Sequence, residues 1–175
     1  MTRILSQKVE FVGRRITVRR DRVIEPSGKE GVRDVVLHPG AVSIVAMPSP
    51  GEIVLIRQYR HAAGEELIEL PAGTLEVGEE PVDTARRELE EETGYVASEM
   101  THLATYYTTP GFTNELMYLY EASGLELRQQ RLEDDEAIDV VLTSREDALT
   151  WIREGKIRDA KTLVGLMMVL GPSLS

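Results

Sequence analysis

The chain has 175 residues, of which 42% are hydrophobic and 29% are charged, which suits one soluble globular domain with its own core. It has no cysteine, which excludes disulfides, thiol catalysis and zinc–thiolate sites and fits a cytoplasmic protein, and no apolar run approaches the ~20 residues of a membrane span. The net charge is −10, with 24 acidic against 9 basic residues after position 60, and this acidity argues against general nucleic-acid binding.

Short β-like runs separated by turn residues fill the first part of the chain. Apolar and β-branched residues recur within residues 4–24, and Gly31–Leu37 is a further strand candidate. We therefore expect an antiparallel strand segment over residues 1–40. Its arginines are expected to face solvent, although they could instead line a binding surface. These are Arg14, Arg15, Arg19, Arg20 and Arg22.

Two strand candidates follow, Ala41–Met47 and Ile53–Tyr59, with a Pro-Gly turn between them. The second is a continuous apolar run of the kind that is buried on both faces, and it ends in the sequence RQYR. Arg57 and Arg60 therefore lie at its end, and guanidinium groups match phosphate oxygens, so both are candidate substrate contacts. Ion pairing is the alternative for Arg60. The nearby acidic residues are Glu65, Glu66 and Glu69.

The most informative stretch is GTLEVGEEPVDTARRELEEETGYV, residues 73–96. Pro81 suits the first turn of a helix, where a missing N–H costs nothing, and Gly94 is a good helix stop. The pattern predicts a helix over Pro81–Thr93, preceded by a short strand at Leu67–Pro71.

Three glutamates lie on one face of this predicted helix, because Glu88, Glu91 and Glu92 are spaced i, i+3 and i+4. Like charges at these spacings destabilise an isolated helix. Hard divalent cations held by oxygen ligands would offset the repulsion, and Arg86 and Arg87 would offset part of it as ion-pair partners. The alternative is an ordinary solvated acidic face.

The same stretch resembles the signature of the Nudix hydrolases over 23 residues, Gly73–Tyr95. The positions in register are Gly73, Glu79, Arg87, Glu88, Leu89, Glu91, Glu92 and Gly94. The resemblance implies a metal-dependent hydrolase that uses two or three Mg²⁺ or Mn²⁺ ions. It also implies that the backbone carbonyl before the first glycine is a metal ligand, and that N-terminal strands pair with a second subunit in a homodimer. The implied metal ligands are Ala72, Glu88, Glu91, Glu92 and Glu136.

A loop at Thr109–Glu115 follows a β-rich run that ends near Tyr107. Pro110 lies sixteen residues after Gly94, and a proline at that spacing is similar to the ADP-ribose pyrophosphatase subgroup of Nudix enzymes, as is the sequence PGFTNE. A plain β-turn is the alternative. The substrate-binding residues implied by this resemblance are Pro110, Gly111, Phe112 and Glu115.

A second acidic run, Glu133–Glu136, precedes a predicted strand at Ala137–Leu142. Taken alone it is a solvated loop. Related ADP-ribose pyrophosphatases carry catalytic acidic residues before the same strand, and Asp134 and Glu136 fall at those positions. The subgroup usually has Glu where this chain has Asp134, so the resemblance does not decide which of the two is the base.

Leu116–Tyr120 is a further strand candidate, and two helices complete the chain. Ser144 is placed to cap a helix that runs to about Glu154, and Asp159–Leu170 is an apolar helix. Together with the family resemblance, these elements predict an α/β fold. We expect a Nudix-type α/β/α sandwich with a mixed sheet and an N-terminal antiparallel strand segment, in one domain over residues 1–175.

The predicted reaction is hydrolysis of the diphosphate bond of ADP-ribose to AMP and ribose 5-phosphate. Its partners are a small-molecule substrate and a second copy of the chain, with neither nucleic acid nor membrane. The candidate catalytic residues are Glu91, Glu92, Asp134 and Glu136.

Three alternatives stay open. The substrate could be another nucleotide sugar such as GDP-mannose, or a dinucleotide. The chain could be a regulatory domain that binds ADP-ribose without cleaving it, although the complete set of glutamates argues against this. The same acidic cluster could also belong to a structural metal-binding protein without turnover.

Overall fold

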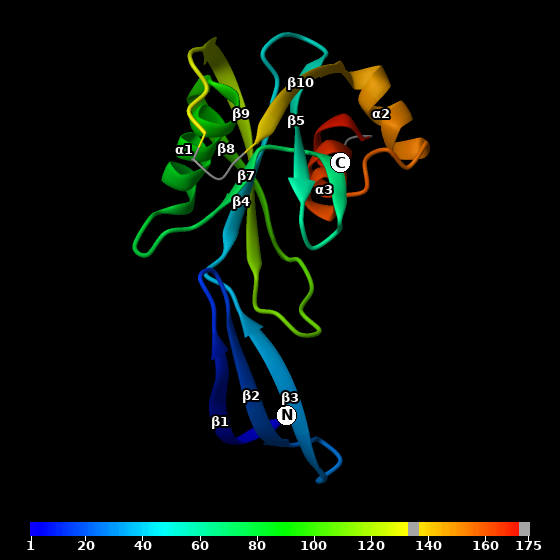
Figure 1. Cartoon of the computed structure of the whole chain (residues 1–175). Coiled ribbons are helices and arrows are strands. Elements are labelled where there is room, and N and C mark those ends of the chain that lie inside the picture. Colours follow the sequence, from blue (N-terminus) through cyan, green and yellow to red (C-terminus); the bar gives the residue numbers. More distant parts are fainter. Residues whose placement is uncertain (133–136, 172–175) are drawn as a thin grey trace. The chain divides into compact units, whose positions relative to one another are not determined.

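The computed structural model describes residues 1–132 and 137–171 (Figure 1). The chain forms two compact units, one of Met1–Gly40 with Tyr106–Leu116 and one of Ala41–Thr105 with Met117–Ser175. The single domain over residues 1–175 stays a prediction. In the described part of the chain, no helix has the length and apolar character needed to cross a membrane.

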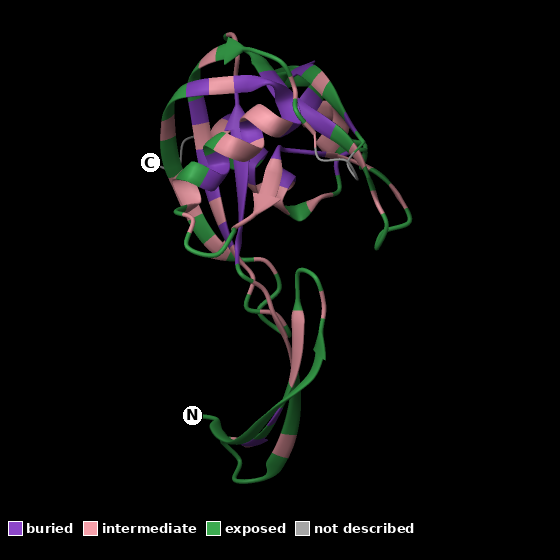
Figure 2. Cartoon of the chain, turned by 60° about the vertical axis from the view of Figure 1, so that its left-hand side comes forward, coloured by how far each residue is buried: buried purple, intermediate pink, exposed green. Residues whose placement is uncertain are grey.

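The first unit holds a three-stranded antiparallel sheet in the order β1-β2-β3. The short runs expected within residues 4–24 are two continuous strands, β1 (Arg3–Val12) and β2 (Thr17–Ile24), and β3 spans Glu30–Leu37. Strand β1 is exposed along its whole length (Figure 2). The sheet therefore buries little apolar surface of its own.

Ion pairs link the charged side chains of this sheet. Arg20 on β2 contacts Asp34 on β3 at 2.7 Å, and Arg22 contacts Glu30 at 2.8 Å. The two arginines are exposed, as predicted. Paired and solvated charges of this kind contribute little to stability.

The segment after β8 lies along β3. The Val36 amide donates to the Phe112 carbonyl at 2.8 Å, and the Asn114 amide donates to the Val36 carbonyl at 3.2 Å. The Asn114 side chain also accepts a hydrogen bond from the backbone of His38 at 2.8 Å. The predicted loop at Thr109–Glu115 is thus held by backbone pairing to a strand some seventy residues earlier in the chain.

A seven-stranded sheet is the centre of the second unit, with the order β10-β5-β4-β9-β8 and with β6 beside β5 and β7 beside β4. Strands β4 and β9 are parallel, whereas β5 pairs antiparallel with β4, β6 and β10, so the sheet is mixed, as predicted. Its strands are β4 (Ala41–Ala46), β5 (Glu52–Arg60), β6 (Glu65–Glu69), β7 (Ala72–Thr74), β8 (Tyr95–Tyr107), β9 (Leu116–Leu127) and β10 (Ile138–Ser144).

Helices cover both faces of this sheet (Figure 1). Every residue of β4 is buried. Ile44 belongs to a core cluster with Leu89 of α1 (Pro81–Thr93). Its neighbour Val45 points the other way, toward α3 (Ala160–Leu170), where a Cβ on Gly165 would come within 3.1 Å of it. A strand buried on both faces between helices confirms the predicted α/β/α sandwich.

Most boundaries agree with the predictions. Helix α1 spans the predicted residues, and Ser144 caps α2 (Arg145–Arg153) by accepting the Asp147 amide at 3.0 Å. Strand β9 runs past the predicted Leu116–Tyr120 as far as Leu127, and Leu125 in this extension packs against the core cluster.

Gly94 ends α1 in the left-handed conformation, with φ of 76°, and a Cβ there would lie 2.7 Å from the Arg128 carbonyl. Gly94→Ala should therefore lose both the left-handed freedom of glycine, about 1–2 kcal/mol, and the close approach of two backbones. Gly155→Ala is the matched control, because Gly155 has φ of 69° but open space around it. Urea unfolding should show a clearly larger loss for Gly94→Ala, and equal losses would contradict the packing argument.

Candidate active site

The acidic face of α1 carries the three glutamates in different environments. Glu92 is 2% exposed. The Glu88 side chain is 13% exposed and that of Glu91 is 35% exposed. Placing a carboxylate in such a buried position requires hydrogen bonds or charges to replace water. The partners of each glutamate therefore show how the sequence makes this face possible.

Arg87 is the central cation of this face. Its Nη1 lies 2.8 Å from Glu88 and 3.0 Å from Glu91. Its Nε donates to Oε1 of Glu79 at 3.1 Å, and its Nη2 donates to Oε2 of the same residue at 3.1 Å. Glu79 lies in the loop before the helix. The hydrogen bonds from Arg87 lower the pKa of Glu79 from 4.5 to about 2. The same hydrogen bonds to Glu79 raise the pKa of Arg87. The predicted ion pairing of Arg87 with the glutamates is confirmed.

Glu92 is oriented by the backbone of the strand beside it. The Ala72 amide at the start of β7 donates to Glu92 Oε2 at 2.8 Å. The end of α1 is held as well, because Gln130 Nε2 donates to the Glu92 carbonyl at 2.6 Å and the Arg131 amide donates to the Glu91 carbonyl at 3.0 Å. The buried carboxylate thus has a defined direction, and the last carbonyls of the helix have partners.

Gly73 makes room for the third carboxylate. A Cβ on Gly73 would lie 1.9 Å from both Cδ and Oε1 of Glu88. Only a residue without a side chain allows the Glu88 carboxylate to lie against the backbone of β7, next to the residue that holds Glu92.

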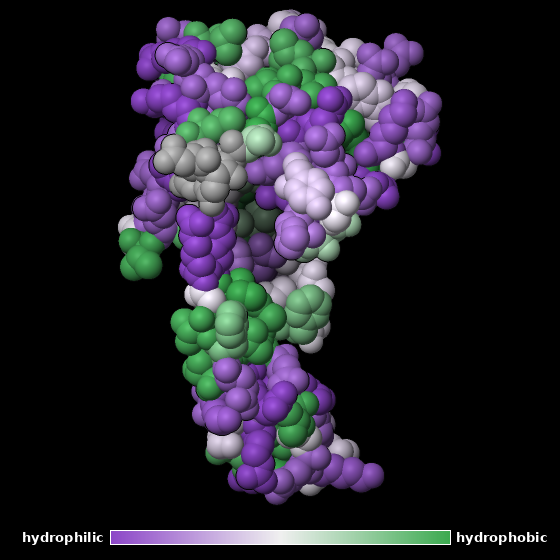
Figure 3. All heavy atoms as spheres, in the orientation of Figure 1, coloured by the Kyte–Doolittle hydropathy of each residue, from purple (hydrophilic) through white to green (hydrophobic). Residues whose placement is uncertain are grey.

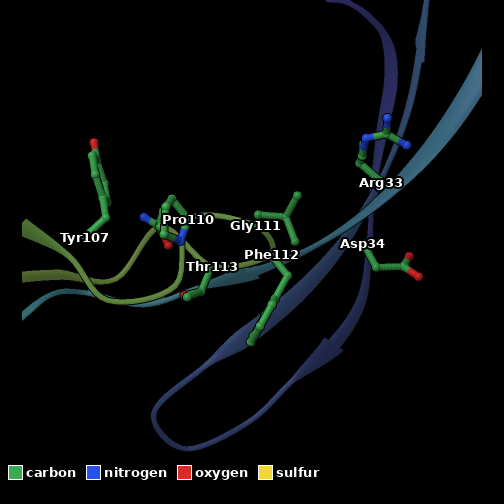
Figure 4. A pocket seen from close by; sticks show the side chains of 9 residues that line it. Arg33, Asp34, Tyr107, Pro110, Gly111, Phe112 and Thr113 are labelled. Carbon is green, nitrogen blue, oxygen red and sulfur yellow. The ribbon is translucent and has the colours of Figure 1, made fainter. Parts of the chain in front are cut away.

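The predicted substrate loop lines a pocket of about 460 Å³ in the first unit. Figure 4 shows Arg33 and Asp34 from β3 beside Pro110, Gly111 and Phe112. The remaining lining residues are Val35, Tyr107, Thr113 and Asn114.

Glu115 belongs to the same segment. It accepts a hydrogen bond from Thr108 Oγ1 at 2.5 Å, and His38 Nε2 lies 3.7 Å from its other oxygen. The structure thus gathers Pro110, Gly111 and Phe112 at one pocket and ties Glu115 to the base of the loop.

A family model described as a NUDIX domain matches residues 37–164. The chain belongs to the Nudix family. A methanol dehydrogenase activator of Bacillus methanolicus is 40% identical over 158 residues, 89% of this chain and 85% of the relative. An ADP-ribose pyrophosphatase of Bacillus subtilis (strain 168) is 39% identical over 160 residues, 90% of this chain and 86% of that protein.

A comparison of folds agrees with the family assignment. A solved structure described as an ADP compounds hydrolase superposes with a TM-score of 0.85 over 96% of this chain and 91% of that chain, at 22% identity. The predicted family and fold are therefore confirmed.

The donors on the Nudix helix fit a hard divalent cation. Carboxylates, and backbone carbonyls such as that of Ala72, are the oxygen ligands that Mg²⁺ and Mn²⁺ prefer. In the described residues, no three acidic or histidine side chains are drawn together closely enough to enclose an ion. Arg87 instead supplies the positive charge between Glu88 and Glu91.

Other predicted residues of the Nudix site have different outcomes. Arg60 forms the ion pair considered as its alternative, with two hydrogen bonds of 2.7 Å to Glu69. Arg57 is exposed on β5. Asp134 and Glu136 lie outside the described residues, so their catalytic role stays a prediction.

The sequence did not point to Gln130 at the end of the Nudix helix, or to Arg33, Asp34 and Tyr107 around the pocket. These residues act through contacts between distant segments, and no local spacing marks such contacts. The adjacent charged residues Arg33 and Asp34 interrupt an otherwise apolar strand candidate, GVRDVVL, and this was the signal available for them.

The Glu79–Arg87 pair should make stability depend on pH. Because the pKa of Glu79 is lowered from 4.5 to about 2, its stabilising contribution is complete above pH 4.5 and is lost as the pH falls toward 2. The difference in unfolding free energy between wild type and Glu79→Gln, measured with urea, should shrink over that range. Glu76→Gln, which changes an exposed neighbour in the same loop, is the control. If the difference in unfolding free energy between wild type and Glu79→Gln stayed constant down to pH 2, it would contradict the pairing.

Proposed function

We propose that the protein hydrolyses the diphosphate bond of ADP-ribose to AMP and ribose 5-phosphate with bound Mg²⁺ or Mn²⁺. The observation that carries this proposal is the buried, oriented Glu92 on the face shared with Glu88 and Glu91. The match to an ADP-ribose pyrophosphatase, which covers 90% of this chain, supports the choice of substrate.

The residues on and beside α1 are proposed to have two roles, metal binding and support of the metal ligands. The carbonyl of Ala72 and the carboxylates of Glu88, Glu91 and Glu92 would hold two or three ions, with Glu136 as a further ligand. Such ions neutralise phosphate charge and lower the pKa of a bound water. Arg87, which is paired with Glu79, would bridge Glu88 and Glu91 while no substrate is bound.

Water attacks one phosphorus of the diphosphate, and the bond from that phosphorus to the bridging oxygen breaks. Either a carboxylate would accept the proton of the attacking water, or a metal-bound hydroxide would serve without a separate base. The candidate carboxylates are Glu91, Glu92, Asp134 and Glu136. Asp134 and Glu136 come soon after Arg131, whose amide is bound to the last turn of α1, which supports including them.

Arg57 and Arg60 are proposed to contact the phosphates, because guanidinium groups match phosphate oxygens. The pairing with Glu69 uses Nε and Nη2 of Arg60 and does not use Nη1, and the Arg60 side chain is 37% exposed. Pro110, Gly111, Phe112 and Glu115 are proposed to contact the rest of the substrate.

Glu92→Gln should lower the rate of Mg²⁺-dependent AMP release from ADP-ribose by at least about a hundredfold, since it removes a charge from an oriented ligand or base. Glu90→Gln is the matched control on the same helix, because Glu90 pairs with Arg131 away from the acidic face, and it should stay near wild type. Chelation with EDTA should abolish the reaction. Equal activity of Glu92→Gln and wild type would rule out the site.

The same assay run with GDP-mannose and a dinucleotide separates the substrate alternatives. Faster turnover of either compound would support diphosphate hydrolysis at this site but would show that ADP-ribose is not the preferred substrate. Binding of ADP-ribose without turnover would favour a regulatory domain, and Mg²⁺ binding with neither would favour a structural metal protein. The 40% identity with a methanol dehydrogenase activator adds a second candidate function, activation of a methanol dehydrogenase, which the rate of methanol oxidation with and without this protein would test.

A homodimer is proposed to cover the N-terminal strands. Val9, Phe11 and Val12 on β1 are between 52% and 71% exposed. Figure 3 shows hydrophobic side chains gathered on this part of the surface beside hydrophilic ones. Burying each such side chain is worth about 1.5–3 kcal/mol, so a second copy of the strands is a favourable cover.

Wild-type protein should therefore sediment as a dimer, and the double variant Val9→Asp with Phe11→Asp should sediment as a monomer. Ser6→Asp, an exposed polar position on the same strand, controls for added charge and should remain dimeric. A monomeric wild type, or a dimeric double variant, would show that these strands do not form the interface.

A further inference from the structure

The start of α3 is attached to the strand segment that leads into the acidic site. The Leu70 amide, just past the end of β6, donates to Thr162 Oγ1 at 2.8 Å, in a wholly buried position. Thr162 Oγ1 in turn donates to Asp159 Oδ2 at 2.6 Å, and the same oxygen caps the helix by accepting the Thr162 amide at 2.9 Å. One hydroxyl therefore joins the helix cap to the backbone of residue 70.

The side chain before this amide is bound to the same helix. Glu69 is completely buried, and its carboxylate accepts hydrogen bonds from Arg60 and from Lys161. Lys161 also lies 3.0 Å from Asp159. Two cations and two anions thus form a compact neutral group, which makes the burial of Glu69 possible.

Electrostatics agree with this geometry. Burial by itself raises the pKa of Glu69, but the hydrogen bonds from Arg60 and the charge of Lys161 outweigh it and leave the pKa below its ordinary value. The hydrogen bonds to Glu69 raise the pKa of Arg60, and the charges of Glu92 and Asp159 add to that effect. The group around Glu69 is therefore in electrostatic reach of the acidic site.

Residues 70–72 contact α3 at one end and α1 at the other. The Leu70 side chain lies where a Cβ on Gly165 would approach it to 2.5 Å, so α3 packs closely against it. Pro71 accepts the Ile44 amide at 2.9 Å, and the Ala72 amide donates to Glu92. A shift of the backbone at residue 70 would thus move the group that orients Glu92.

We propose that Thr162 and Lys161 on α3 are positioning residues for the metal centre, acting through Leu70 and Glu69 on the backbone of Ala72 and on Glu92. This inference rests on the proposed function and deepens it. It assigns to the C-terminal helix a part in metal binding, although the helix contributes no ligand of its own.

Mn²⁺ binding without substrate tests this, measured by the electron paramagnetic resonance signal of free Mn²⁺. Thr162→Val keeps the shape but removes the hydroxyl, and it should weaken Mn²⁺ binding by about 10- to 100-fold, the usual effect of losing a group that supports a ligand. Thr162→Ser restores the hydroxyl and should bind nearly as wild type. Thr101→Val, at an exposed position, is the control.

Lys161→Met provides a second, independent arm in case Thr162→Val does not fold, which circular dichroism melting would reveal. It should also weaken Mn²⁺ binding, Lys161→Arg should restore it, and Lys156→Met, an exposed lysine nearby, should have no effect. Wild-type affinity in both folded variants would overturn the proposal, as would the failure of both conservative variants to rescue. Failure of the proposed function would look different, because wild type would then bind Mn²⁺ without releasing AMP from ADP-ribose.

Discussion

Two carboxylates that have been taken out of water constrain the second unit. Glu92 on α1 and Glu69 on β6 are both buried, and a buried charge without partners would cost several kcal/mol. Glu92 is satisfied through the Ala72 amide, and Glu69 through Arg60 and Lys161. Only two residues, Leu70 and Pro71, lie between Glu69 and Ala72, so one short segment of backbone must serve both.

This constraint explains where close packing is needed. Glycine at position 73 lets the Glu88 carboxylate lie against β7, and glycine at position 165 lets α3 approach Leu70 and Val45. A larger residue at either place would push a helix away from the segment that links the two carboxylates. The sandwich is therefore tight where the chemistry of the site requires defined directions, and the acidic face gains its order from both sides of the sheet.

Arg87 solves a different part of the same problem. Its pairs with Glu79, Glu88 and Glu91 offset the repulsion among carboxylates on one helix face, so α1 can fold before any cation binds. A divalent ion would compete with Arg87 for Glu88 and Glu91. Glu92 accepts a hydrogen bond from the backbone amide of Ala72, so this contact does not involve Arg87.

The sequence by itself determined the elements and the family. Proline at 81, glycine at 94 and glutamates at i, i+3 and i+4 act within a few residues, so helix α1, its end and its acidic face were predictable. The register of Gly73–Tyr95 was enough to indicate the Nudix family, and a continuous apolar run marked β5 as a buried strand. Local rules also placed the cap of α2 at Ser144.

Only the tertiary structure decided which partner each charged side chain has. Three glutamates near Arg60 were equally plausible from the sequence, and Glu69 was selected because it alone is buried between β5 and α3 with Lys161 beside it. The hydrogen bond from Leu70 to Thr162, and the pairing of β3 with residues 112–114, likewise join segments that are far apart in the chain. Such contacts depend on how strands and helices pack in three dimensions, and a single sequence carries no local pattern that specifies them.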